Sequence, residues 1–406
     1  MNILYIEHYA GSPEMGMEFR PYYLSREWVK MGHKVTIIAG DYSHLRKKNP
    51  ENIDGDFKKE MIDGIEYRWV RTGAYSGNGV KRALTMERFV RKLMLNAKRI
   101  ARKWNPDVVI ASSTYPLDTY PAQKIAKLSG AKYIHEVHDM WPSTLYEVGG
   151  MSKHSPFVVT MQIAENSAYK HCDKCVSLLK YSKDYMLQHY LEENKFIYIP
   201  NGVVKEEWDN PLPLPYEYLS VFENNKDKFI VGYFGGHALS NCLNTLIEAA
   251  EIMKEEQVQF VLVGDGVEKK NLEKYVTDKK LKNVTFLPPI EKRVIPKLTE
   301  YFDCVYVGAK KSPLYRFGVC PNKMFDGMMA AKPVIFAIDA PPSPITDSDC
   351  GIVVKSENPK LLKDAIISLI NTPKKEREQM GDRGKQEVLN KYIYEKLAND
   401  FVVLMY

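Results

Sequence analysis

The chain has 406 residues, of which 45% are hydrophobic and 27% charged, and its formal net charge at pH 7 is +6. This ordinary globular composition excludes a disordered, collagen-like or coiled-coil chain, and the length predicts two or three domains. No apolar run is long enough to cross a bilayer, the first residues lack a basic signal-peptide segment, and six cysteines are too few for a disulfide framework. We therefore expect a cytoplasmic protein, and the mild positive charge does not require nucleic acid as a partner.

Short β-branched runs alternate with longer amphipathic stretches from end to end. This alternation predicts parallel sheets covered by helices on both faces, and the runs are too many for one open sheet. In chain order we predict strands at Asn2–Ile6, Val35–Ala39, Ile65–Val70, Asp107–Ala111, Lys132–Val137, Cys175–Leu179 and Phe196–Ile199, then at Phe229–Phe234, Gln259–Val263, Val284–Leu287, Cys304–Val307, Val334–Ala337 and Gly351–Val354.

The pattern breaks between these two series of strands. Residues 205–228 carry three prolines and no clear period, which predicts a linker after a first domain at residues 1–204. Both domains open with a strand, a glycine-bearing turn and a helix, with Gly11 and Gly16 in the first turn and Gly235-Gly236 in the second. Two doubly wound α/β domains bind ligands outside the carboxyl ends of their strands, so we expect these ends to face a cleft.

The glycine-bearing turns are candidate phosphate sites, because a helix N-terminus offers unpaired N–H groups and partial positive charge. The glycines of the first turn stand five apart and do not form the G-x-G-x-x-G fingerprint of dinucleotide binding. No G-x-x-x-x-G-K-[ST] motif occurs either. Nicotinamide oxidoreductases and P-loop enzymes are therefore disfavoured, whereas a tight turn and a phosphate site both remain open for Gly235-Gly236.

The segment 315–326 concentrates charge at the start of a predicted helix. Arg316 and Lys323 could neutralise a diphosphate, and Asp326 could accept hydrogen bonds from sugar hydroxyls. A solvated loop with a stray ion pair is the alternative. The predicted strands on either side look buried and favour the binding role.

A second candidate functional segment, residues 135–142, covers the end of a predicted strand and the residues that follow it. Strand alternation places Glu136 and His138 on one face and His135 and Asp139 on the other. No further ligands stand at metal-site spacing, so we expect no metal here. An acid/base or substrate-binding role for His138 or Asp139 competes with that of a hydrogen-bonded histidine at a strand end. Cys172-x-x-Cys175 stands alone and is read as structural.

The predicted helix 80–104 is the most basic segment of the chain. It has an apolar stripe and a polar face, and Glu87 is its only acidic residue. Such a helix can lie on an anionic membrane surface, or it can simply present a solvated face. We see no nucleic-acid-binding motif and expect no nucleic-acid partner. The residues that we assign to a membrane or acceptor face are Arg88, Arg91, Lys92 and Arg99.

At these residues the sequence resembles the family-four retaining glycosyltransferases of GT-B fold. It looks closest to the branch that adds N-acetyl-fucosamine-type sugars to bacterial O-antigen or capsule repeat units. The motifs occur in family order across nearly the whole chain and read GSPEMGMEFRPYYLSREWVKMGHKVTIIAG, EVHDMWP, IPNGV, GYFGGHALSNCLNTLIEAA, FVLVGDG and YRFGVCPNKMFDGMMAAKPVI.

The resemblance implies two Rossmann-like domains of GT-B type. The first, residues 1–204, would bind the acceptor, and the second, residues 229–390, would bind a nucleotide-sugar donor, with UDP as the expected nucleotide. A last helix at residues 391–406 would cross back to the first domain. The expected acceptor is a soluble or polyprenyl-diphosphate-linked glycan, so the protein could sit at the inner face of the cell membrane. The resemblance implies no cofactor and no metal.

Individual residues carry the family's roles by similarity. The donor would be bound by Gly16, Gly235, Gly236, His237, Gly264, Pro289, Ile290, Arg316, Asn322, Lys323 and Asp326. In this set Arg316, Asn322 and Lys323 would offset the diphosphate charge, and Asp326 would hold the ribose. His138 and Asp139 would face the donor sugar or the acceptor, Glu18 would lie near the donor, and these three residues are the expected catalytic residues.

The sequence also departs from the family pattern. The first of the family's paired glutamates is replaced by Gly318, and His138 stands where this branch often has arginine. The basic residues common after the first strand of the second domain are replaced by a GGH…N arrangement. A non-hydrolysing nucleotide-sugar epimerase and a non-catalytic nucleotide-sugar-binding protein are the alternative functions.

Overall fold

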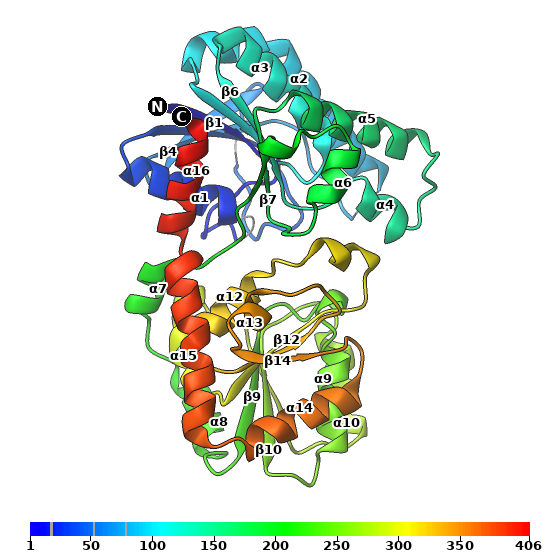
Figure 1. Cartoon of the computed structure of the whole chain (residues 1–406), viewed down its shortest axis with the longest axis vertical. Coiled ribbons are helices and arrows are strands. Elements are labelled where there is room, and N and C mark those ends of the chain that lie inside the picture. Colours follow the sequence, from blue (N-terminus) through cyan, green and yellow to red (C-terminus); the bar gives the residue numbers. More distant parts are fainter. Residues whose placement is uncertain (17–18, 52, 78) are drawn as a thin grey trace. The chain divides into compact units, whose positions relative to one another are not determined.

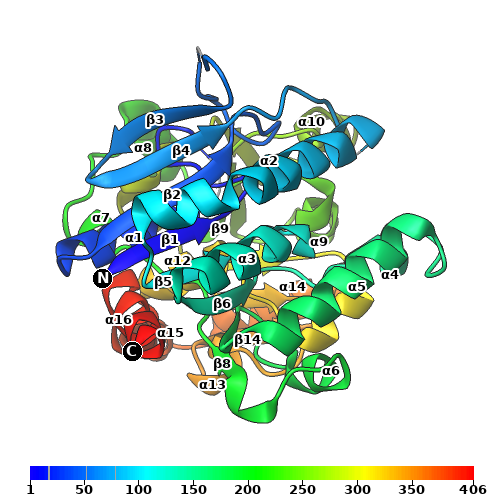
Figure 2. The same ribbon diagram turned by 90° about the horizontal axis from the view of Figure 1, so that it is seen from above.

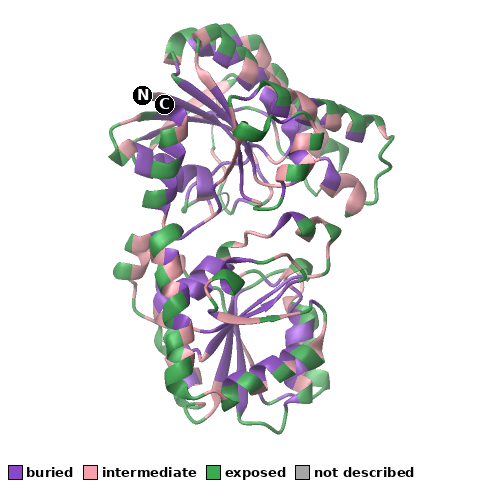
Figure 3. Cartoon of the chain, viewed as in Figure 1, coloured by how far each residue is buried: buried purple, intermediate pink, exposed green. Residues whose placement is uncertain are grey.

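The computed structural model describes residues 1–16, 19–51, 53–77 and 79–406. They divide into two compact units, the first made of residues 1–200 with 394–406 and the second of residues 201–393. Each unit is an α/β domain with helices on both faces of its sheet (Figure 1). Figure 3 shows that the strands are buried, whereas the outer faces of the helices are exposed.

The sheet of the first unit has the strand order β3-β4-β2-β1-β5-β6-β7-β8 within the described residues. Its neighbours pair in parallel, except for β3 and β4. The order reverses between β1 and β5, which is where ligands bind in doubly wound sheets. The strands are β1 (Asn2–Ile6), β2 (Lys34–Gly40), β3 (Phe57–Ile62), β4 (Ile65–Val70), β5 (Val108–Ala111), β6 (Lys132–Val137), β7 (Lys174–Ser177) and β8 (Phe196–Tyr198).

Strand β3 is absent from the predicted set. It pairs with β4 as an antiparallel hairpin whose two turn residues, Asp63 and Gly64, have φ of 48° and 80°. Positive φ at both positions is the geometry of the tight hairpin turn that Asp-Gly favours. The sequence therefore contained a signal for the hairpin, but the charged, half-exposed β3 lacks the apolar run of a buried strand.

Right-handed crossovers place α1 on one face of this sheet and α2, α3 and α5 on the other. The latter three lie side by side in both views (Figure 2). No helix among the described residues combines the length and the apolar character needed to cross a membrane. The helices are α1 (Phe19–Lys30), α2 (Val80–Trp104), α3 (Thr119–Ser129), α4 (Ser143–Glu147), α5 (Pro156–His171), α6 (Lys183–Gln188) and α16 (Tyr394–Met405).

The last helix, α16, is part of the first unit and packs against α1. The indole Nε1 of Trp28 donates to the carbonyl of Ala398 at 3.0 Å, and its ring contacts Phe401 edge to face. The return to the first unit begins at Tyr394, a few residues after the predicted start of the helix.

The second unit has a parallel sheet of order β11-β10-β9-β12-β13-β14 within the described residues. Along β9, Ile230 and Phe234 belong to an apolar cluster on one face, and Val231 and Tyr233 to a cluster on the other. Both faces of the sheet are therefore covered, as in other parallel sheets. The strands are β9 (Phe229–Phe234), β10 (Val258–Val263), β11 (Val284–Leu287), β12 (Cys304–Gly308), β13 (Val334–Ala337) and β14 (Gly351–Val354).

The predicted linker 205–228 is wrong, because this segment folds as part of the second unit. It contains two helices, and Tyr218 and Phe222, one turn apart on the second, are buried in the core of that unit. Charged neighbours hide this short apolar stripe in the sequence. The helices of the unit are α7 (Lys205–Asp209), α8 (Tyr216–Glu223), α9 (Leu243–Ile252), α10 (Lys269–Asp278), α11 (Ile295–Thr299), α12 (Asn322–Met329), α13 (Pro344–Asp347), α14 (Pro359–Asn371) and α15 (Lys374–Lys391).

Candidate functional site

In the first unit, polar side chains gather at the carboxyl edge of the sheet, where β1, β5 and β6 are neighbours. Glu7 follows β1, Ser112 follows β5, and His138 follows β6. Parallel pairing brings these positions to one edge because the carboxyl ends of all three strands point the same way. The edge lies beside the point where the strand order reverses.

A buried ion pair supports this edge. Arg20 of α1 donates through Nε to Glu136 Oε1 at 2.9 Å, and the two side chains are 4% and 0% exposed. The guanidinium also donates to the carbonyls of Ile199 and Pro200, the last residues of the first unit before the chain leaves it. Tyr5 of β1 donates its hydroxyl to Glu136 Oε2.

The same carboxylate contacts His138. The imidazole Nε2 lies 2.9 Å from Glu136 Oε2 and 3.2 Å from Ser112 Oγ, and Ser112 donates to Glu7 Oε2 at 3.1 Å. Burial alone would raise the pKa of Glu136, but Arg20, His138 and the hydrogen bonds together hold it below its ordinary value. Glu136 is therefore ionised at neutral pH.

Asp139 is placed differently from His138. Its Oδ1 accepts from the Met140 amide at 2.8 Å and from the Thr144 hydroxyl at 3.1 Å, at the turn into α4. Burial raises its pKa, although these hydrogen bonds and His138 act in the opposite direction. The observed contacts give Asp139 a role in shaping the turn.

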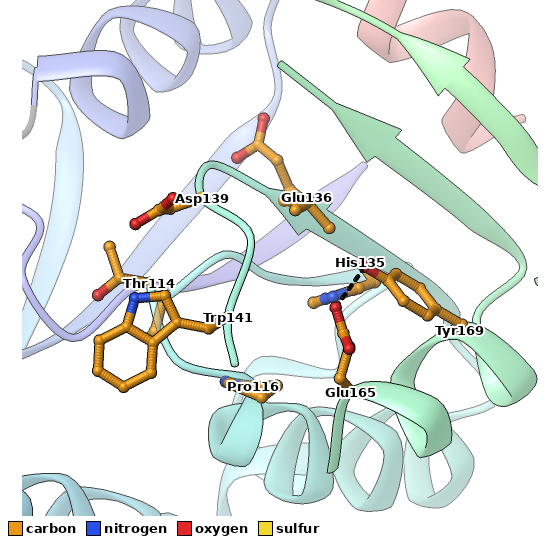
Figure 4. Close-up of a pocket in the computed structure, with 10 residues that line it drawn as sticks. Thr114, Pro116, His135, Glu136, Asp139, Trp141, Glu165 and Tyr169 are labelled. Atoms are coloured by element: carbon orange, nitrogen blue, oxygen red, sulfur yellow. Dashed lines mark hydrogen bonds between the residues drawn. The ribbon is translucent and has the colours of Figure 1, made fainter. Parts of the chain in front are cut away.

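A small cavity lies behind this turn (Figure 4). Its volume of about 10 Å³ is enough for roughly one water molecule. Asp139 and Trp141 lie on one side, and His135, Glu165 and Tyr169 on the other. Burial lowers the pKa of His135 to about 4 and raises that of Glu165 to about 8, so both are largely neutral near pH 7. The cavity has no room for a sugar.

A much larger cavity, of about 840 Å³, lies between the start of α2 and the α4–α5 region. Among the described residues, its polar lining consists of Arg82, Thr114, Asp139 and Thr144, apart from two glycines. The rest is apolar, and Val148 and Met151 at the rim are 57% and 37% exposed. Its apolar lining consists of Val80, Ala83, Met86, Trp141, Leu145, Val148, Met151 and Phe157.

The first glycine-bearing loop is held by Arg46, which donates to the carbonyls of Gly40 and Ala10. Gly16 has φ of 78°, and a Cβ there would lie 3.1 Å from the side chain of Lys47. The predicted donor residue Gly16 is thus in the first unit, next to a lysine. The predicted catalytic residue Glu18 lies outside the described residues.

In the second unit, glycines bring the turns after β9 and β10 into close contact. Gly235 and Gly264 have φ of 128° and 146°. A Cβ on Gly264 would lie 1.9 Å from the Gly235 carbonyl oxygen, so only glycine fits. The His237 amide donates to the Asp265 carbonyl at 2.8 Å, which locks the two turns together.

Lys323, in the first turn of α12, reaches into this glycine turn. Its Nζ lies 3.0 Å from both Tyr233 Oη and Asn241 Oδ1, and those two side chains each donate to the Gly236 carbonyl at 2.7 Å. A Cβ on Gly235 would lie 2.9 Å from Lys323 Cε. Burial lowers the pKa of Lys323 to about 8, and Asp326 acts against that shift. The ammonium is held by neutral partners beside exposed backbone.

His237 lies beneath the same turn and is fully buried. Neither ring nitrogen has a hydrogen-bond partner in the described structure, and the ring lies between Tyr233 and Phe286. Burial lowers the pKa of His237 to about 4, and Lys269 and Lys323 shift it in the same direction. His237 is therefore a neutral packing residue of the turn.

The other predicted donor residues are spread along the same edge of the second sheet. Asp326 lies one turn after Lys323 on α12 and is buried, which raises its pKa to about 6 against the effect of Lys292 and Lys323. Asn322 is exposed at the start of α12, and Pro289 and Ile290 follow β11. Arg316 is exposed, donates to the Pro313 carbonyl at 2.7 Å and stacks on Phe317.

Most basic side chains assigned to a membrane or acceptor face already have partners within the first unit. Arg91 pairs with Glu87 at 2.8 Å, and Lys92 pairs with Asp56. Arg88 donates to the Thr72 carbonyl, and Arg99 lies over the ring of Phe57. Arg88, Arg91 and Arg99 remain exposed on α2, together with Leu84 and Leu95.

The sequence analysis did not identify the residues that hold these site residues in place. Tyr5, Glu7 and Arg20 join the first site from elements far from residues 135–142, and Tyr233 joins the second from inside a strand. One usable signal was Glu7 at the end of an apolar strand. Burial of its carboxylate is costly unless polar partners surround it, so its position indicates a polar cluster there. Among the described residues, no group of three or more His, Cys, Asp or Glu side chains is placed to hold a metal ion.

Comparison with protein-family models gives two matches along the chain. Residues 15–207 match the model described as Glycosyltransferase Family 4, and residues 217–387 match Glycosyl transferases group 1. The chain is also similar to WcaI of Escherichia coli, whose name assigns it to colanic acid biosynthesis as a glycosyl transferase. The identity is 24% over 303 residues, which cover 73% of this chain and 74% of that protein.

Solved structures share the fold. Sucrose-phosphate synthase of Thermosynechococcus elongatus superposes with a TM-score of 0.73 at 17% identity, covering 99% of this chain and 97% of that one. Anabaena Alr3699/HepE, in complex with UDP and glucose, gives a TM-score of 0.66 at 15% identity, with 99% and 98% covered. At such identities the likeness establishes the fold alone.

The close approach at Gly264 leads to a stability prediction. Gly264→Ala forces a Cβ onto the Gly235 carbonyl at an unfavourable φ, so we expect a loss of roughly 1–3 kcal/mol or more from strain. Gly236→Ala is the matched control, because a Cβ there meets no atom within 4 Å. Urea unfolding of both variants checks this, and equal stabilities would contradict the tight contact of the two turns.

Proposed function

The chain belongs to the glycosyltransferases of GT-B fold, and on that premise we propose that it is a retaining, metal-independent enzyme. In this proposal it moves a sugar from a nucleoside diphosphate, UDP, to a glycan acceptor of bacterial surface polysaccharide synthesis. The similarity to WcaI supports the pathway class, and the UDP in the Anabaena HepE structure supports the nucleotide. Comparison of the anomeric configuration of donor and product by NMR tests retention.

The observation that carries the donor site is the environment of Lys323. Lys323 is half-buried, and loss of water around its ammonium lowers its pKa although Asp326 acts in the opposite direction. Its hydrogen bonds within the described residues go to neutral oxygens, so an anion there would stabilise its charge. Beside it, the glycine turn leaves the backbone open to close approach by a ligand. We assign the diphosphate to this place.

The proposed chemistry follows from charge. Breaking the sugar–phosphate bond leaves additional negative charge on the diphosphate, and a fixed cation stabilises that charge in the transition state. Lys323 would supply this cation in place of a metal. Asp326, one turn further along α12, would accept hydrogen bonds from the ribose hydroxyls.

Replacement of Lys323 tests the donor site. We expect Lys323→Ala to weaken UDP binding by about ten- to a hundredfold, because a charge-assisted contact of about 1.5–3 kcal/mol is lost. Since the pKa of this lysine is about 8 in the free protein, binding should also weaken as pH rises above 8, and the variant should lose that dependence. Isothermal titration calorimetry with and without EDTA measures both effects.

Lys270→Ala is the control, because Lys270 is an exposed lysine of α10. It should bind UDP like the unmodified protein. Equal UDP affinity in Lys323→Ala would move the donor site elsewhere, and loss of binding on addition of EDTA would contradict the metal-independent mechanism.

We assign the acceptor to the first unit, beside the 840 Å³ cavity. The wall of this cavity is mostly apolar, which suits a hydrocarbon chain better than a sugar. Its rim exposes Val148 and Met151 to solvent, where large apolar side chains are unfavourable unless something covers them. These features favour a polyprenyl-diphosphate-linked acceptor over a soluble glycan.

Farnesyl diphosphate is a short probe for this cavity. We expect it to change the fluorescence of Trp141, which lines the wall, and Val148→Asp to weaken its binding about tenfold by loss of apolar contact. Val159→Asp is the matched control, since Val159 is an exposed valine of α5 outside the lining. If farnesyl diphosphate and inorganic diphosphate bind equally well, the cavity does not bind the hydrocarbon chain of the acceptor.

We further propose that α2 touches an anionic membrane through its exposed basic residues and the exposed Leu84 and Leu95. Co-sedimentation with vesicles should show binding to anionic lipid that decreases with salt. The double variant Lys98→Glu/Arg102→Glu, on the exposed face of α2, should reduce it. If neutral and anionic vesicles bind equally poorly, the exposed face of α2 does not bind a membrane and is only solvated.

A further inference from the structure

His138 has an arrangement that determines where its proton sits. The residue stands two positions after Glu136 at the end of β6, on the same side of the strand, and its Nε2 lies 2.9 Å from Glu136 Oε2. The carboxylate is ionised beside Arg20, so Oε2 can only accept a hydrogen bond. Nε2 must therefore carry the hydrogen.

Ser112 reinforces this tautomer from the neighbouring strand. Its hydroxyl donates to Glu7 Oε2 at 3.1 Å, which leaves an oxygen lone pair directed at His138 Nε2, 3.2 Å away. The single Nε2 hydrogen thus faces two acceptors. The opposite nitrogen, Nδ1, forms no hydrogen bond to a described residue, and the side chain is 11% exposed.

We propose that Glu136, held by Arg20, is a positioning residue that fixes His138 as the Nε2–H tautomer, so that Nδ1 accepts a hydrogen bond from a substrate sugar hydroxyl. In that tautomer the lone pair on Nδ1 attracts a hydroxyl and repels a phosphate oxygen, so it favours the sugar part of a ligand. The substrate named here rests on the proposed transferase function, whereas the tautomer does not.

The variant Glu136→Gln makes a sharp test because Arg20 fixes its orientation. Arg20 donates through both Nε and Nη2 to the Oε1 position, so the amide oxygen of glutamine should remain there. The amide NH₂ then occupies the Oε2 position and donates to His138 Nε2. We expect the ring hydrogen to move to Nδ1, which removes the acceptor that the sugar would use.

NMR of protein labelled with ¹⁵N-histidine reads the tautomer directly, and a His138→Gln variant assigns the signal. At pH 8 the unmodified protein should show the Nε2–H form, and Glu136→Gln the Nδ1–H form. Tyr5→Phe is the matched control, because it removes another donor to the same oxygen without changing the charge of Glu136. It should keep the original tautomer.

UDP release from UDP-glucose provides the second measurement. We expect it to fall about five- to tenfold in Glu136→Gln, as for the loss of one hydrogen bond, while calorimetric UDP affinity is unchanged. An Nδ1–H ring in the unmodified protein overturns the inference, and so does a Glu136→Gln variant that keeps either its Nε2–H form or its full UDP release.

If Glu136→Gln fails to fold, as judged by circular dichroism, the His138 tautomer of the unmodified protein and of Tyr5→Phe tests the inference instead. The Nε2–H form in both supports it, and the Nδ1–H form in either overturns it. An unmodified protein that neither binds UDP nor releases it from UDP-glucose, yet holds His138 as Nε2–H, would contradict the proposed function and support the positioning role of Glu136.

Discussion

The buried pair of Arg20 and Glu136 organises the first unit around one carboxylate. Through it, helix α1, strand β1, the end of β6 and the last carbonyls before the chain leaves the unit share a single hydrogen-bonded cluster. Apolar side chains of similar volume can stabilise a protein as well as a buried ion pair does. The pair is better explained by the geometry that it imposes on His138 and on the chain at Pro200.

The two units differ in how they accommodate charge away from water. In the first unit the charge of Arg20 is matched by Glu136, and the groups nearest His138 are hydrogen-bond donors and acceptors. In the second unit the half-buried Lys323 donates to neutral oxygens next to a glycine turn, and the carboxyl group of Asp326 lies one turn further along α12. A surface of the first kind favours polyols, and a surface of the second kind favours an anion.

Much of this arrangement could be predicted from the sequence, because local patterns determine it. Apolar runs in the sequence predicted the buried parallel strands, and the charged residues at the start of α12 indicated Lys323 and Asp326 as site residues. The misses have physical causes. The short apolar stripe of α8 is masked by charged neighbours, and β3 is an edge strand that needs little apolar surface. Arg20 and Glu136 are 116 positions apart, so their contact depends on tertiary structure.

The packing of α16 on α1 has a consequence for how the protein is made. The first unit is assembled from two separate stretches of chain, and Phe401, the partner of Trp28, is synthesised only after residues 201–393. Until then α1 keeps an uncovered aromatic surface, while residues 201–393 can already fold as a unit. Synthesis of the first unit therefore begins before that of the second but ends after it. Until α16 is made, the incomplete first unit must remain soluble with the aromatic surface of α1 exposed.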